Sequence, residues 1–203
     1  MSLTASFKPS KTYALVSKEQ QTIKKLFMLL AGNIDANNGT FWLGNQILNR
    51  HALAKNVGLV ANNQQIYNDT LLKNICQQET FVQTKRLQHI LNCFAATHAL
   101  IKEPNDLNLI IDVNSLSLYD RHIILLARIL YKNFKILLLD DVDNTFTEKY
   151  WVNLILMLRK NFPNMTILLN TAQKGLIKQC NFVYAFDNGK LCFTGKSKKY
   201  LKN

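Results

Sequence analysis

Short runs of consecutive apolar residues alternate along the chain with longer segments in which apolar residues recur at every third or fourth position. The short runs, at residues 13–16, 57–60, 136–139 and 165–169, predict buried strands. The periodic segments, at residues 23–30, 70–100, 120–131 and 148–160, predict helices. Alternating strands and helices predict an α/β fold with a mainly parallel sheet that helices flank.

Turn residues mark the boundaries of these elements. Gly32 follows the first helix at the position where glycine commonly ends helices. Residues 41–47 predict a hairpin, and the Asp187-Asn188-Gly189 turn predicts a second, C-terminal hairpin from residues 182–186 and 190–193. The helical stretch that begins at residue 70 interrupts the α/β pattern. We therefore expect an α/β core of residues 1–69 and 116–203 with a helical subdomain of residues 70–115.

The 203-residue length suits one domain with a real core. No apolar stretch reaches the roughly 20 residues of a membrane span, and the start has no secretory signal, so we expect a cytoplasmic protein. The four cysteines, which we expect to be free and mostly buried thiols, are widely spaced and form no Cys-x-x-Cys pair. With scattered histidines as well, the sequence predicts no zinc site.

The charge is unusual, because 25 Lys and Arg residues face 13 Asp and Glu residues, a formal net charge of +12. Such a surface attracts nucleic acid, anionic lipid or an acidic partner. The lysines are nevertheless spread out, and only residues 190–202 are locally dense. Without an Arg-rich helix or an aromatic and basic stripe we expect no specific nucleic-acid partner. A solvated basic surface, with a peripheral position at the inner face of a membrane, is the plainer interpretation.

Several segments occur in an order and at intervals that recur in one family. They are Ala14-Leu15-Val16 with residues 26–32, the hairpin at 39–47, residues 57–60 with Tyr67-Asn68-Asp69-Thr70-Leu71-Leu72-Lys73-Asn74-Ile75, residues 116–130, residues 135–140, and residues 187–195. Over essentially the whole chain this series resembles the ATP-binding cassette domain of exporter-type ABC transporters. The resemblance implies a P-loop NTPase-type fold. It also implies a preceding strand with an adenine-stacking aromatic, for which residues 1–11 are too short.

The phosphate loop of that family reads G-x-x-G-x-G-K-[ST], because glycines let backbone N–H groups point at phosphate. Residues 17–25 stand there as Ser-Lys-Glu-Gln-Gln-Thr-Ile-Lys-Lys, without a glycine. The resemblance places Ile23 at the phosphate lysine and Lys25 at the magnesium-binding hydroxyl, beside Ser17, Thr22 and Lys24. We expect tight Mg-ATP binding to be lost. Lys24 and Lys25 are then either solvated or attract an anion at this helix N-terminus.

The other active-site positions implied by the resemblance are altered as well. Leu118, Tyr119 and Asp120 follow Ser117 where the family has the glycines of its LSGGQ signature. The catalytic glutamate, the Q-loop glutamine and the switch histidine are replaced by Asp141, Asn62 and Ala172, and the D-loop reads Asn144-Thr145-Phe146-Thr147. Asp140 keeps the Walker B carboxylate, as a magnesium contact or as a cap for loop amides. We expect no catalytic residue and no metal.

From these changes we expect a non-hydrolysing pseudo-ATPase with no bound cofactor. Its partners would be the membrane subunit or an active cassette subunit of an ABC transport system, docked around residues 62–75. One alternative is a weakly active ATP-binding subunit that holds ATP and magnesium. Another is a basic module that binds nucleic acid or an anionic surface, and a third is a decaying gene or a piece of a longer protein.

Overall fold

The computed structural model describes residues 4–61, 64–77, 80–95, 107–140 and 146–202. The chain divides into two compact units, which we call unit 1 (residues 1–61 and 134–203) and unit 2 (residues 62–133). Unit 2 contains the predicted helical subdomain, residues 70–115, together with the helix α5, which the sequence analysis assigned to the α/β core.

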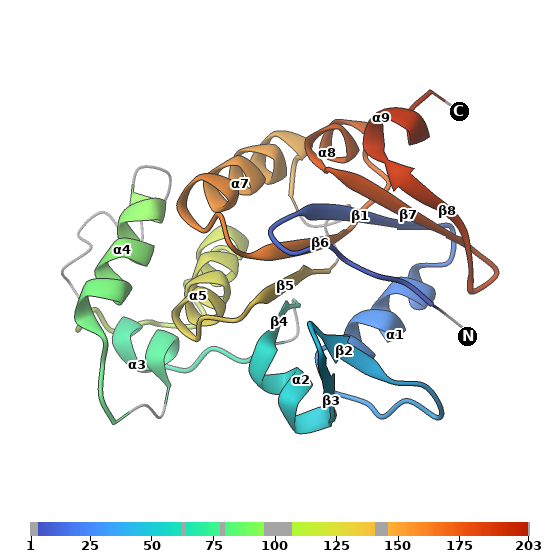
Figure 1. Ribbon diagram of the computed structural model, residues 1–203. Coiled ribbons are helices and arrows are strands. Elements are labelled where there is room, and N and C mark those ends of the chain that lie inside the picture. The colour runs from blue at the N-terminus through green and yellow to red at the C-terminus, as the bar shows by residue number, and fades with distance from the viewer. Residues whose placement is uncertain (1–3, 62–63, 78–79, 96–106, 141–145, 203) are drawn as a thin grey trace. The chain divides into compact units, whose positions relative to one another are not determined.

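A six-stranded sheet forms the centre of unit 1, in the order β4-β5-β6-β1-β7-β8 (Figure 1). Its strands are β1 (Thr12–Ser17), β4 (Val57–Val60), β5 (Ile136–Leu139), β6 (Thr166–Asn170), β7 (Phe182–Asp187) and β8 (Lys190–Lys196). All neighbouring pairs are parallel except β7 with β8, which run antiparallel. The sheet is thus mainly parallel, as predicted, because its central strands are apolar runs buried on both faces.

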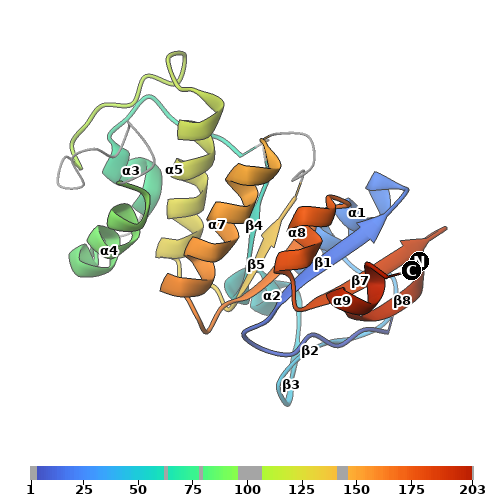
Figure 2. The same ribbon diagram turned by 90° about the horizontal axis from the view of Figure 1, so that it is seen from above.

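Helices cover both faces of this sheet. They are α1 (Gln20–Leu30), α2 (Arg50–Asn56), α7 (Glu148–Asn161), α8 (Lys174–Gln179) and α9 (Ser197–Tyr200). Figures 1 and 2 show α7, α8 and α9 over one face, with α1 and α2 on the other. On the α1 side, Leu15, Leu138 and Leu168 of the sheet pack with Phe27 of α1 into one buried cluster. This cluster fixes α1 against the sheet.

Both predicted hairpins are present. The first consists of β2 (Phe41–Leu43) and β3 (Gln46–Leu48), with Gly44 at a φ of 59° in its turn. In the second, Asn188 and Gly189 link β7 to β8 at φ angles of 48° and 70°, the left-handed geometry that an Asn-Gly turn provides. Gly32 likewise has a φ of 71° and ends α1, and a Cβ there would lie 2.6 Å from the Arg50 carbonyl oxygen.

The helices of unit 2 within the described ranges are α3 (Leu71–Cys76), α4 (Thr84–Ala95) and α5 (Leu118–Tyr131). Arg128 of α5 is 5% exposed. Its Nε donates to the Asn74 carbonyl oxygen at 2.8 Å, and its Nη1 donates to the Gln65 carbonyl oxygen at 3.0 Å. Burial lowers the pKa of this guanidinium. Arg128 therefore ties α5 to the backbone on both sides of the segment that leads into α3.

The four cysteines are free thiols, as predicted, although only Cys76 and Cys180 are buried. Cys93 is half-buried and Cys192 is exposed. Burial raises the pKa of Cys180 to about 12, so that thiol stays protonated.

Candidate functional site

The connection between β1 and α1 is short. β1 ends at Ser17 and α1 begins at Gln20, so only Lys18 and Glu19 lie between them. The predicted helix began at Ile23, and the observed one begins three residues earlier because the segment lacks glycine and proline and is rich in helix formers. No residue from Ser17 to Lys25 is among the described residues with a positive φ. Most of the stretch that aligns with the phosphate loop is therefore a helix.

Ile23 occupies the position that the resemblance gives to the phosphate lysine. Its side chain is 0% exposed and belongs to the core cluster with Leu15 and Phe27. An apolar side chain in this place contributes to folding through burial. It offers neither a charge nor a hydrogen-bond donor to an anion.

Glu19 organises the start of α1. Its Oε2 accepts a hydrogen bond from the Thr22 hydroxyl at 3.1 Å, and its Oε1 accepts one from the Asn188 backbone N–H at 3.0 Å. Its own N–H donates to the Ser17 hydroxyl at 3.1 Å. A carboxylate is favourable at a helix N-terminus, where the backbone N–H groups create a positive potential. Two predicted site residues, Ser17 and Thr22, are thus brought together by an acidic residue that the sequence analysis did not single out.

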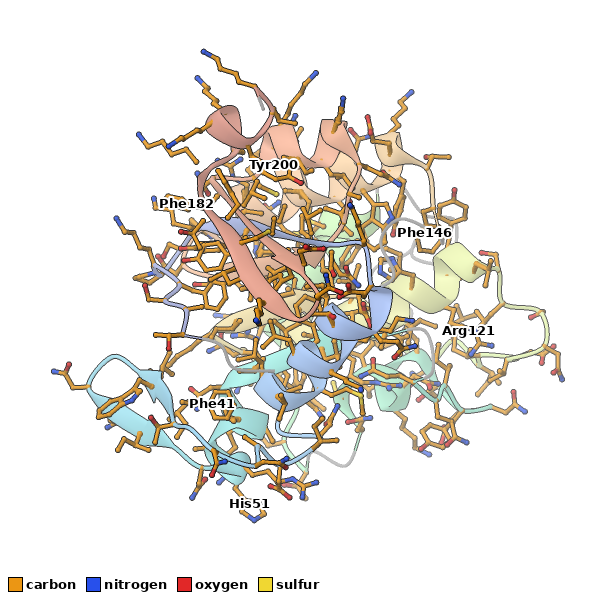
Figure 3. The ribbon with its side chains drawn as sticks, turned by 90° about the vertical axis from the view of Figure 1, so that its right-hand side faces the viewer. Phe41, His51, Arg121, Phe146, Phe182 and Tyr200 are labelled. Atoms are coloured by element: carbon orange, nitrogen blue, oxygen red, sulfur yellow. The ribbon has the colours of Figure 1, made fainter. Side chains whose placement is uncertain are left out.

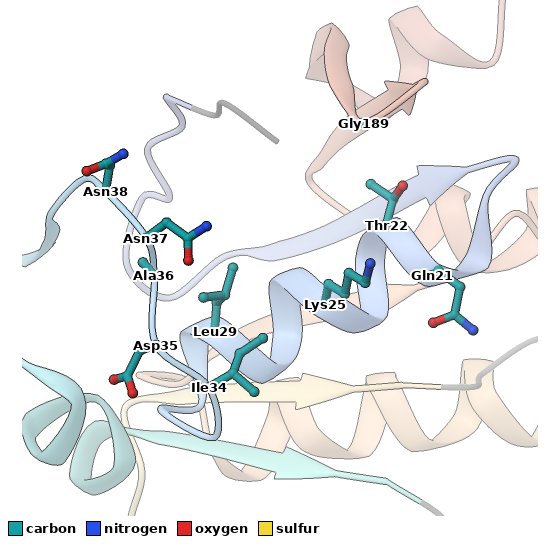
Figure 4. A pocket seen from close by; sticks show the side chains of 10 residues that line it. All are labelled: Gln21, Thr22, Lys25, Leu29, Ile34, Asp35, Ala36, Asn37, Asn38 and Gly189. Atoms are coloured by element: carbon teal, nitrogen blue, oxygen red, sulfur yellow. The ribbon is translucent and has the colours of Figure 1, made fainter.

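A groove of about 580 Å³ runs along the exposed side of α1. In Figure 4 the Lys25 side chain extends along the helix toward Thr22. Among the described lining residues, Lys25 is the one cation, and Asp35, which pairs with Arg50 at 3.1 Å, is the one acid. Gln21, Thr22, Leu29, Ile34, Ala36, Asn37, Asn38 and Gly189 complete the lining. The groove is therefore mostly neutral. Lys24, the neighbouring predicted residue, is half-buried and makes contacts of its own.

Asp140 follows β5 at the carboxyl end of the parallel sheet. Its Oδ1 accepts a hydrogen bond at 2.8 Å from the side-chain amide of Asn170, the last residue of β6.

Thr171 is buried, and the exposed Ala172 has only a methyl group where the family has a histidine. Over the described ranges, no three His, Cys, Asp or Glu side chains gather as metal ligands. Asp141 and Asn62, two more predicted positions, lie outside the described residues, as do residues 144 and 145.

The segment that aligns with the LSGGQ signature forms the N-terminus of α5. The Ser117 hydroxyl accepts from the Asp120 N–H at 3.1 Å and donates to the Asp120 carboxylate at 2.6 Å. Ser117 is thus the N-cap residue of α5, and Asp120 stands in the third helical position. Leu118 and Tyr119 are 66% and 41% exposed. Like α1, α5 therefore begins with a carboxylate from its own chain.

The sequence from Tyr67 to Ile75 forms an ordered surface of unit 2. Asn74, 1% exposed, closes a turn: its Oδ1 accepts from the Tyr67 N–H at 2.9 Å and its Nδ2 donates to the Tyr67 carbonyl oxygen at 2.9 Å. Thr70 caps α3, and Asp69 pairs with Lys73 at 3.1 Å. The Thr70 N–H and then Lys73 lower the pKa of Asp69. A pocket of about 700 Å³ opens here, lined by Tyr67, Asp69, Lys73, Asn74, Cys76, Gln77 and Lys132.

The mainly parallel sheet, the helix directly after its β1 strand and the acidic residue after β5 define the class of P-loop NTPase-type α/β domains. The family profile described as ABC transporter matches residues 24–144. The chain belongs to this family, as an exporter-like ATP-binding cassette domain.

Two curated relatives illustrate the similarity. The glutathione/L-cysteine transport system ATP-binding/permease protein CydC of Haemophilus influenzae is 24% identical over 199 residues, which cover 95% of this chain and 34% of CydC. The ATP-dependent lipid A-core flippase of Saccharophagus degradans is 24% identical over 204 residues, covering 98% of this chain and 35% of the flippase. The chain thus spans about a third of the length of these relatives.

Among solved structures, a bacterial Atm1-family ABC exporter with ATP bound superimposes with a TM-score of 0.78. Its sequence identity is 18%, and the match covers 95% of this chain and 35% of the exporter chain, so this likeness supports the fold. Within the described ranges, every helix is too short or too polar to cross a bilayer.

Proposed function

We propose that this chain is a non-hydrolysing pseudo-ATPase that acts as a structural or regulatory partner in an ABC transport system. One observation carries the proposal. The two helix N-termini that align with the phosphate loop and the signature, those of α1 and α5, each have an acidic residue of the chain itself beside them, Glu19 as the N-cap residue of α1 and Asp120 in the first turn of α5. An anionic triphosphate would meet a negative charge at each of them.

The remaining donors also do not fit Mg-ATP. The position of the phosphate lysine holds the buried Ile23, and the helix that begins at Gln20 leaves no loop whose N–H groups could surround a phosphate. At the end of β5, the Oδ1 atom of Asp140 already accepts a hydrogen bond from the Asn170 amide, which a magnesium ion on the same oxygen would compete with. We therefore assign no chemical step to a nucleotide or a metal in this protein.

The surface around Tyr67 supports the partner role. Its backbone is held by the buried Asn74, and Tyr67 itself is 52% exposed beside the 700 Å³ pocket. A rigid frame that presents an exposed aromatic side chain is typical of an interaction surface. One relative bears the name ATP-binding/permease protein, which joins a cassette to a membrane part. We infer that a membrane subunit or an active cassette subunit docks here and holds the chain at the inner face of the membrane.

The partner role is tested by co-purification of the tagged chain with the membrane subunit of an ABC exporter. Replacing Tyr67 by alanine is expected to reduce capture of that subunit by about tenfold, because central aromatic anchors carry much of the energy of an interface. The Trp42→Ala variant is the matched control, since Trp42 is also an exposed aromatic residue, at 61%, but lies on the β2–β3 hairpin of unit 1. Equal capture by wild type and both variants, or no capture at all, would exclude the docking surface.

A weakly active ATP-binding subunit is the rival function, and Asp140 favours it. This carboxylate stands after β5, where functional side chains collect in parallel sheets. A true ATPase would lose its activity in the Asp140→Asn variant. The pseudo-ATPase assignment predicts identical background hydrolysis with and without this substitution.

A further inference from the structure

Positive charge is distributed unevenly between the two units. Unit 1 contains 18 Lys and Arg residues against 7 Asp and Glu residues, whereas unit 2 contains 7 against 6. The excess charge of the protein therefore belongs almost wholly to unit 1. Net charge of this size creates a potential that attracts anionic partners over a Debye length.

Within unit 1 the cations concentrate on one helical layer. Helices α7 and α8 and residues 196–202 together carry nine Lys and Arg side chains, all of them exposed. The single acid among them is Glu148, which accepts a hydrogen bond from the Gly175 N–H at 3.2 Å. The ion pairs among the described residues lie elsewhere, between Arg50 and Asp35 and between Lys73 and Asp69. We call this layer the basic helical face.

The nine cations are exposed on an outer layer of unit 1. Helices α7, α8 and α9 lie over the same face of the sheet in Figures 1 and 2. In Figure 3, where Tyr200 marks α9, long side chains that end in nitrogen project from this part of the molecule into solvent. The basic helical face is thus an outer surface of unit 1 with its ammonium groups available to a large anion.

The chemistry of the face distinguishes between anionic partners. Eight of the nine cations are lysines, which are hydrated point charges, whereas nucleic-acid sites favour arginine forks and aromatic side chains that stack on bases. The Tyr200 ring packs on Phe193 at a centroid distance of 5.2 Å, and Leu156 is the one exposed large hydrophobic residue described on these helices. Clusters of four to eight lysines without such stacking groups are typical of surfaces that bind anionic lipid.

We propose that the basic helical face binds the surface of a bilayer that contains anionic phospholipid. The interaction is electrostatic, with ammonium groups against lipid phosphates and no insertion of a helix. It needs neither a nucleotide nor the partner subunit, so it stands independently of the proposed function. Lys198, Lys199 and Lys202 supply the densest part of the charge, and Lys174 and Lys178 on α8 extend it.

The test is co-sedimentation of the chain alone with vesicles of phosphatidylcholine, with or without phosphatidylglycerol. Wild type is expected to bind only the vesicles with phosphatidylglycerol and to be released by molar salt. Changing Lys198, Lys199 and Lys202 to glutamate should weaken binding by about tenfold or more, and changing Lys174 and Lys178 to glutamine should produce a smaller loss. All five side chains are exposed, so the variants are expected to fold.

The matched control changes Lys11, Lys55 and Lys135 to glutamate. These lysines are also exposed, but they precede β1, β4 and β5 and do not belong to α7, α8 or residues 196–202, and the change in net charge is the same. Binding of this control should stay within about twofold of wild type. Equal losses in the two triple variants, equal binding to pure phosphatidylcholine, or tighter binding to an RNA duplex at the same salt would overturn the proposal. None of these outcomes bears on capture of the membrane subunit.

Discussion

The Ile23→Lys variant is expected to lose about 4 kcal/mol of folding stability, because it puts an ammonium group into a fully buried, apolar site. Ile23 is 0% exposed and packs among Leu15, Phe27 and other core residues. In a cassette that binds ATP, a lysine at the aligned position would recreate the side chain that binds the phosphates of the nucleotide. In this chain the same substitution is expected to damage the fold of unit 1 without creating nucleotide affinity.

Urea unfolding followed by tryptophan fluorescence measures this effect, because both tryptophans, Trp42 and Trp151, belong to unit 1. Ile23→Met keeps the apolar volume and should cost less than about 1.5 kcal/mol. Gln21→Lys adds the same charge to an exposed position of α1 and should change stability by less than about 0.5 kcal/mol. A folded Ile23→Lys protein with wild-type stability and new affinity for Mg-ATP would show that the segment is still a phosphate loop.

Replacing Arg128 by leucine is expected to destabilise unit 2 by about 3 kcal/mol, because two carbonyl groups lose their charged donor. Those carbonyls belong to Asn74 and Gln65, and the side chain that binds them is 5% exposed. Leucine preserves part of the volume, so the loss reports mainly on hydrogen bonding. Arg128→Lys should fall in between, since one ammonium cannot reproduce the fork of a guanidinium.

Hydrogen exchange of the unit 2 amides measures this loss residue by residue. Faster exchange is expected in α3 and α5, and unit 1 amides serve as the internal reference. Arg121→Leu is the control, because the guanidinium of Arg121 makes a long contact, 3.5 Å, with the Val113 carbonyl oxygen in the described part of unit 2. If the unit 2 amides exchange at the same rates in the Arg128→Leu and Arg121→Leu variants, Arg128 does not hold α5 to the backbone at Gln65 and Asn74.

The long apolar segments of the sequence were sufficient to predict the fold. β1, β5 and β6 follow continuous apolar runs, and α5 and α7 show clear helical periodicity, so each was predicted within a few residues. Three short helices, α2, α8 and α9, were not predicted, because 4 to 7 residues are too few for a helical period to be visible. The start of α2 has one local signal, the Asn49 side chain that accepts from the Ala52 N–H.

The candidate site could be predicted only in part. The resemblance located Thr22 and Ser117, and the Ser117–Asp120 spacing is itself a capping signal. The contact between Glu19 and Asn188 could not be predicted, because the two residues are 169 positions apart and only the folded sheet brings the β7–β8 turn to α1. The resemblance identified Asp120 as one of the residues that stand in place of the signature glycines. The structure adds that this carboxylate binds Ser117 at the start of α5.

The central claim, that the chain's own carboxylates occupy both helix N-termini, is tested most directly by nuclear magnetic resonance. Millimolar Mg-ATP is added to the labelled chain while the backbone amides of Lys18–Thr22 and Leu118–Asp120 are followed. The account predicts that these resonances do not move. A saturable shift of both groups at micromolar Mg-ATP, removed by Asp140→Asn, would contradict it.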